Sequence, residues 1–135
     1  MEQQQQLRAT RRSGHHTQWA AQFAVASELC KRGYEVSFTM GNTTPRADLM
    51  VVSPSGKMFL IDVKGVKTKT CWLLRKKALC DNLFYAFAYV PECEPNKFFI
   101  MAQLGVNDVV HDGPMPDVRW NDLRLNENAW HLLPE

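Results

Sequence analysis

Residues 48–64, D-L-M-V-V-S-P-S-G-K-M-F-L-I-D-V-K, consist of two short apolar segments on either side of a Ser-Pro-Ser-Gly turn. Two apolar segments separated in this way predict a β-hairpin. Pro54 suits the first corner of a type I turn, and Gly56 falls where a three-residue loop requires a left-handed residue. A loop of this kind pairs Ser53 with Lys57.

Counting outward from the turn sets the register of the two strands, which pairs Val51 with Phe59, Leu49 with Ile61 and Asp48 with Asp62. Opposed residues of an antiparallel pair share a face of the sheet, with Cβ atoms about 4.5–5.5 Å apart. Lys64 lies two residues beyond Asp62 and therefore points the same way. The hairpin predicts two carboxylates and one ammonium group on one face.

Like charges that face each other in a sheet are unfavourable unless a cation neutralises them. A hard divalent cation held by carboxylate oxygens is one solution. Two alternatives stay open. In the first, Lys64 alone bridges the two carboxylates. In the second, the register is shifted by one residue, which turns Asp62 to the other face.

The composition is that of one globular domain: 135 residues, 45% hydrophobic and 22% charged. No apolar run approaches the roughly 18 residues that a membrane-spanning helix requires, and the polar N-terminus has no signal-peptide core. The four cysteines show no C-x-x-C spacing. We therefore expect reduced thiols, no zinc site and a cytoplasmic protein.

The charges are distributed unevenly along the chain. Residues 1–80 hold 13 Lys and Arg against 5 Asp and Glu, whereas residues 81–135 hold 3 against 9. Such a basic half suits a polyanion, and a solvated surface is the alternative. The candidate phosphate contacts are Arg46, which precedes the hairpin, and the basic run after it: Lys67, Lys69, Arg75, Lys76 and Lys77.

Residues 1–14, with few apolar residues and a Gln run, predict a flexible N-terminal arm, and residues 15–135 a single domain. A helix should begin near residues 15–17 and end at Gly33. Its expected apolar stripe is Trp19, Phe23, Ala26 and Cys30, widened by Val25 and Leu29.

Gln22 falls about 30° from the centre of that stripe at 100° per residue, so its amide should point inward. A buried amide needs hydrogen-bond partners. Either Gln22 bonds the backbone of the core, or it takes part in the site.

Further strands are expected over residues 34–40, 83–90 and 98–102, with a short helix over 105–110. Residues 66–82 are either a short helix or an irregular crossover. Trp72, beside the basic run, is either a core residue or a platform on which a base stacks.

This order of elements resembles the PD-(D/E)xK nuclease superfamily, in particular its small resolvase-like and restriction-endonuclease-like members. The residues behind the resemblance are Asp48 in P-R-A-D, the I-D-V-K-G segment with Asp62 and Lys64, and the helix A-Q-F-A-V-A-S-E-L. The resemblance implies an α/β fold with a restriction-endonuclease-like core. Such a core is a central mixed β-sheet of about five strands flanked by helices, in the order αβββ(α)ββ.

The resemblance also implies an activity, that of a Mg²⁺- or Mn²⁺-dependent endonuclease hydrolysing phosphodiester bonds in nucleic acid, with DNA as the expected substrate. Asp48, Asp62 and the Val63 carbonyl would hold the metal. Lys64 would orient or help to deprotonate the attacking water. Small nucleases of this type often act as homodimers, since two strands need two sites.

The chain departs from the superfamily pattern at Gln22, where members often place a helical Glu that completes the metal site. Glutamine offers an oxygen ligand but no charge, so the site should hold metal more weakly. The alternative is therefore a catalytically weakened or inactive nuclease-fold module that binds nucleic acid or a protein partner.

Overall fold

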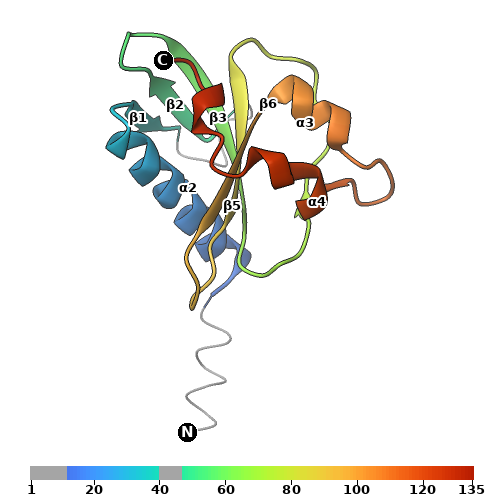
Figure 1. Ribbon diagram of the computed structural model, residues 1–135. Helices are drawn as coiled ribbons and strands as arrows, with labels where there is room; N and C mark the ends of the chain where they lie inside the picture. Colours follow the sequence, from blue (N-terminus) through green and yellow to red (C-terminus); the bar gives the residue numbers. More distant parts are fainter. Residues whose placement is uncertain (1–11, 40–46) are drawn as a thin grey trace, which may run out of the picture.

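The computed structural model describes residues 12–39 and 47–135. Arg46 and most of the predicted arm, residues 1–11, lie outside these ranges. A five-stranded sheet with the order β1-β2-β3-β5-β6 forms the centre (Figure 1). Its strands are β1 (Glu35–Phe38), β2 (Leu49–Val52), β3 (Met58–Val66), β5 (Leu83–Tyr89) and β6 (Lys97–Ala102).

The sheet is mixed, because β3 and β5 run parallel while all other neighbours are antiparallel. Helix α2 (Gly14–Lys31) packs on one face, together with the C-terminal 3-10 turn Trp130–Leu132. Helix α3 (Gln103–Val109) and the short α4 (Trp120–Leu123) pack on the other face. The predicted class, a mixed central sheet flanked by helices, is confirmed.

The predicted hairpin forms in the predicted register over the paired strands, with Val51 opposite Phe59 and Leu49 opposite Ile61. Ser53 N–H donates to the Lys57 carbonyl at 2.8 Å, and Gly56 has φ +92°. Glycine tolerates this left-handed conformation without a Cβ clash. The turn chemistry thus sets the face of every residue on β2 and β3.

The crossover from β3 to β5 contains no helix. It contributes the two-residue strand β4 (Trp72–Leu73), which pairs with β7 (Asp117–Val118) in a second small sheet. Trp72 is buried, and its indole N–H donates to the Ala88 carbonyl at 3.3 Å. Its ring packs against those of Phe87, Phe99 and Trp120. Trp72 is therefore a core residue, which excludes stacking on a base.

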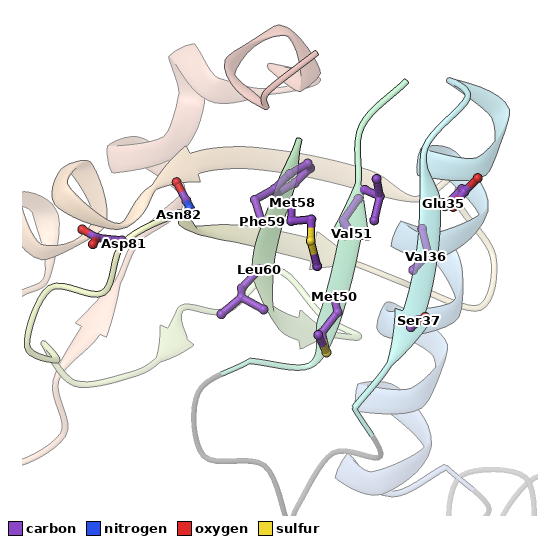
Figure 2. Close-up of a pocket in the computed structure, with 11 residues that line it drawn as sticks. Glu35, Val36, Ser37, Met50, Val51, Met58, Phe59, Leu60, Asp81 and Asn82 are labelled. Atoms are coloured by element: carbon purple, nitrogen blue, oxygen red, sulfur yellow. The ribbon is translucent and has the colours of Figure 1, made fainter. Parts of the chain in front are cut away.

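The face of β1, β2 and β3 that points away from α2 carries an open, largely apolar groove of about 470 Å³ (Figure 2). Met50, Met58 and Leu60 line its floor, with Glu35 and Asp81 at its sides. Side chains alternate along a strand, so Asp62 and Lys64 continue the row of Met58 and Leu60 on β3. The groove and the predicted site thus share one face of the sheet.

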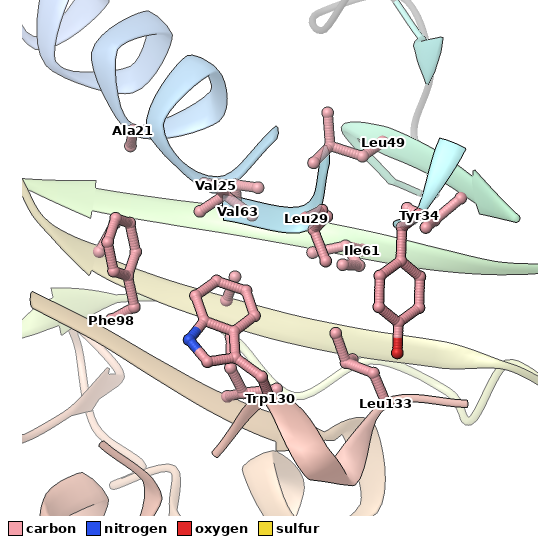
Figure 3. Packing of buried hydrophobic residues seen from close by; sticks show 14 of the residues in the cluster. Ala21, Val25, Leu29, Tyr34, Leu49, Ile61, Val63, Phe98, Trp130 and Leu133 are labelled. Atoms are coloured by element: carbon pink, nitrogen blue, oxygen red, sulfur yellow. The ribbon is translucent and has the colours of Figure 1, made fainter. Parts of the chain in front are cut away.

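The core between α2 and the sheet is built from small and branched residues of the helix, including Ala21, Val25 and Leu29 (Figure 3). The predicted stripe was partly wrong, because Phe23 is 58% exposed and Cys30 is exposed. The reason is close approach at Gly65, where an added Cβ would lie 2.6 Å from the Cβ of Ala21. The helix therefore turns its small residues to the sheet.

The ends of α2 follow local chemistry. Ser13 caps the helix through a reciprocal contact with His16, so α2 begins at Gly14, slightly before the predicted start. At the other end, Gly33 has φ +88° and donates to the Cys30 carbonyl, and Tyr34 donates to Leu29. This is a Schellman motif, and it ends the helix where a C′ glycine predicts.

Candidate functional site

The site lies where β3 extends past β2. Strand β2 begins at Leu49, opposite Ile61, so no strand among the described residues pairs with the β2-facing edge of β3 beyond Ile61. There the Val63 N–H donates to Oδ2 of Asp48 at 2.8 Å, and the Val63 carbonyl accepts from Nε2 of Gln18 at 2.7 Å. Two side chains thus replace the missing strand, which satisfies the buried backbone polar groups.

Asp48 and Asp62 approach each other at this edge. Burial raises the pKa of Asp48 to about 6, and the charge of Asp62 and hydrogen bonding with it raise the pKa further, against the Val63 N–H and Lys64, which lower it. Asp62 is only 5% exposed. Two carboxylates this close repel each other unless cations neutralise them.

Two ammonium groups contact Asp62. Nζ of Lys64 lies 3.3 Å from Oδ1, and Nζ of Lys77 lies 3.1 Å from Oδ2. We call Asp48, Asp62, Lys64 and Lys77 the carboxylate cluster. The cluster holds two carboxylates and two ammonium groups. Lys64 is therefore not the only cation that neutralises the carboxylates.

Two of the other predicted phosphate contacts have partners outside the cluster. The Lys67 ammonium donates to the Arg12 carbonyl at 3.1 Å, and Lys76 pairs with Asp112 at 3.4 Å. Lys69 and Arg75 are exposed. Their role in binding nucleic acid stays a prediction.

Gln22 is 2% exposed, as its predicted inward direction requires, and its Oε1 has no hydrogen-bond partner among the described residues. Gln18 and Gln22 are four residues apart and so lie along one line of α2. An unpartnered buried oxygen costs free energy, and such an atom is a candidate ligand or hydrogen-bond acceptor.

Sequence reasoning missed Gln18, although the i,i+4 spacing of two glutamines on one helix was a usable signal. It also missed Tyr85, which lies opposite Asp62 in the β3–β5 ladder. The Tyr85 hydroxyl is buried and has no hydrogen-bond partner among the described residues. Burial first, and then the charge of Asp62, raise the pKa of Tyr85 to about 12. Its hydroxyl therefore keeps its proton at neutral pH.

These donors fit a hard divalent cation. Asp48 and Asp62 offer carboxylate oxygens and Val63 a carbonyl, and oxygen ligands are those that Mg²⁺ prefers. The amide oxygen of Gln22 has no partner among the described residues, and its part in holding an ion stays a prediction. Across residues 12–39 and 47–135, no three His, Cys, Asp or Glu residues gather as one metal site. The site therefore rests on two carboxylates.

Comparison with solved structures supports the described fold. No protein-family model matches the chain, and no curated protein matches it. Among solved structures the chain is similar to a bacterial homing endonuclease, I-Ssp6803I, at 22% sequence identity and a TM-score of 0.62. The match covers 89% of this chain and 90% of that chain. The chain thus shares its α/β fold with that endonuclease.

In the part of the chain that the structure describes, no helix has the length and apolar character needed to cross a membrane. The expected homodimer, the cytoplasmic location and the division into an arm (1–14) and a domain (15–135) stay predictions.

Proposed function

We propose that this chain is an endonuclease of the PD-(D/E)xK type that hydrolyses phosphodiester bonds in DNA with Mg²⁺ or Mn²⁺. One observation supports this above all. Asp48 and Asp62 meet at the free edge of β3, with Lys64 against Asp62 at 3.3 Å. The nuclease-like fold supports the same activity class.

Asp48, Asp62, the Val63 carbonyl and the Gln22 amide would hold the ion. A bound divalent cation supplies a Lewis acid that activates water and neutralises phosphate charge. The Val63 N–H keeps Asp48 in place, and Gln18 orients the peptide that carries the Val63 carbonyl. Lys64, half-buried and one pleat beyond Asp62, would orient the attacking water.

The test is cleavage of supercoiled plasmid and branched DNA by the purified chain with Mg²⁺ or Mn²⁺. We expect nicked and linear products that disappear in EDTA and in the Asp62→Ala variant. Asp122→Ala, which alters a distant carboxylate paired with His111, is the matched control and should cleave normally. Wild-type protein as inert as Asp62→Ala on every substrate would refute the proposal.

A second candidate is favoured by Gln22, which supplies no charge to the ion. In this case the chain binds nucleic acid through its basic residues and does not cut it. Binding should then weaken by about 0.9 log units per log unit of salt for each phosphate neutralised. Salt-dependent binding without cleavage under any metal would favour this candidate over the enzyme.

A further inference from the structure

Lys77 reaches Asp62 from the crossover between β3 and β5, and not from the strand that carries Asp62 and Lys64. Its ammonium lies 3.1 Å from Oδ2 of Asp62, whereas Lys64 contacts Oδ1. The Lys77 side chain is nevertheless 43% exposed. It therefore contacts a buried carboxylate and remains open to a molecule that arrives from solvent.

Two side-chain amides of α3, Gln103 and Asn107, hold the backbone around Lys77; we call them the amide pair. Nδ2 of Asn107 donates to the Lys77 carbonyl at 3.0 Å, and Nε2 of Gln103 donates to the Ala78 carbonyl at 3.1 Å. Oε1 of Gln103 accepts from the Cys80 N–H at 2.8 Å.

This support is unusual for an irregular surface segment. Residues 74–80 have no regular secondary structure, yet three of their backbone groups are bonded to a single helix, and Gln103 is itself buried. A satisfied buried polar network makes a segment rigid. The effect of this network is to hold one lysine at Asp62.

The charge of the site suggests what Lys77 does there. Phosphodiester hydrolysis builds negative charge on the non-bridging oxygens of the phosphate, and two-metal nucleases neutralise it with a second ion. With two carboxylates and an uncharged Gln22, this site supports one divalent ion. A fixed cation of the protein is then needed to neutralise the remaining negative charge on the phosphate oxygens.

We propose that Lys77 is a catalytic residue that contacts a non-bridging oxygen of the scissile phosphate, in place of a second metal ion, and that the amide pair positions it. This inference rests on the proposed nuclease function. In the reaction, the oxygen of water bonds to phosphorus while the bond from phosphorus to the leaving ester oxygen breaks. Water loses one proton and the leaving oxygen gains one, so a phosphomonoester and a hydroxyl group result. Lys77 stabilises the charge and exchanges no proton.

The same placement predicts competition in the absence of DNA. A divalent ion held by Asp62 would share that carboxylate with the Lys77 ammonium, so removing the ammonium should tighten ion binding. A residue that only supported the fold would loosen ion binding when altered. Metal affinity and cleavage rate should therefore move in opposite directions in a Lys77 variant.

The experiment compares wild type, Lys77→Met, Lys77→Arg and Lys57→Met, a matched loss of one lysine in the exposed hairpin turn. Mn²⁺ binding to DNA-free protein is measured by calorimetry. Single-turnover cleavage is measured with protein in excess over plasmid and with saturating Mn²⁺. For Lys77→Met we expect Mn²⁺ affinity several-fold tighter and cleavage about 100-fold slower, the usual effect of losing one preorganised charge-stabilising donor. Lys77→Arg should recover at least a tenth of the rate.

Different outcomes separate the two proposals. If wild type cleaves and Lys77→Met cleaves within threefold of it, the role of Lys77 is overturned while the nuclease proposal stands. Slow cleavage with weakened Mn²⁺ binding, or a parallel effect in Lys57→Met, also overturns it. If wild type does not cleave, both fail. Gln103→Met is a second variant: it keeps Lys77 but should slow cleavage, with faster amide exchange at Cys80.

Discussion

Gln18 and Val63 are joined by a 2.7 Å hydrogen bond from the side-chain amide Nε2 to the main-chain carbonyl oxygen. The bond connects α2 to β3 at the point where β2 has ended. It therefore supplies the Val63 carbonyl with the hydrogen-bond donor that a neighbouring strand supplies elsewhere in the sheet. The same residue, Val63, donates its N–H to Asp48. Helix, strand and carboxylate thus meet at one residue, Val63.

Replacing Gln18 by Met should destabilise the fold by about 1–2 kcal/mol, because the buried Val63 carbonyl loses its donor. Urea unfolding measures the change. Ser27→Met, at an exposed position of the same helix, controls for the introduced methionine. Equal midpoints for the two variants would show that the bond contributes nothing.

The pKa of Asp48, raised to about 6 from 3.8, links stability to pH. Between these values the folded protein keeps a proton that the unfolded chain has lost, so the free energy of unfolding falls as pH rises from about 4 to 6. After allowance for solvent screening the loss is about 1–2 kcal/mol. Asp48→Asn should remove this component and be more stable than wild type at pH 7 without metal. Parallel pH profiles for the two proteins would contradict this.

Gln22→Glu adds a third carboxylate to the site. Without metal it should destabilise the fold by about 2–4 kcal/mol, as an uncompensated buried charge does. Mg²⁺ should restore stability, since a ligand that binds only the folded state stabilises it. Melting temperatures in EDTA and in Mg²⁺ measure this difference, and Gln22→Met serves as the uncharged control. An equal Mg²⁺ response in wild type, Gln22→Glu and Gln22→Met would place residue 22 outside the ion's reach.

Gly65→Ala should destabilise the fold by about 1–3 kcal/mol, because its Cβ would overlap that of Ala21 and force α2 away from the sheet. Gly14→Ala is the matched control, since nothing lies within 4 Å of a Cβ there. That variant should be neutral or slightly stabilising. Thermal unfolding of both variants decides; a neutral Gly65→Ala would mean that the helix shifts without cost.

The hairpin was predictable because its turn is local. The three-residue loop requires a left-handed conformation at position 56, which glycine adopts. The loop length then fixes the register that aligns Leu49 with Ile61. The inward direction of Gln22 followed equally from helical periodicity. Such features depend on a few consecutive residues, so the local sequence is enough to predict them.

Other features depend on contacts between distant residues. Phe23 is exposed because Gly65, over 40 positions later, draws Ala21 to the sheet. The short pairing of β4 with β7 joins segments whose apolar content alone gives no register. Lys77 looked like one cation in a basic run, and only the hydrogen bonds from Gln103 distinguish it from its neighbours.

The overhang of β3 past β2 makes the Val63 amide a spectroscopic reporter. In most of the sheet an amide N–H donates to a backbone carbonyl, which does not titrate. The Val63 N–H donates instead to the carboxylate of Asp48, which titrates and is proposed to bind an ion. Its nitrogen and proton resonances should therefore shift when Asp48 is protonated or coordinated. A single backbone resonance can thus follow occupancy of the centre in a protein that is not turning over.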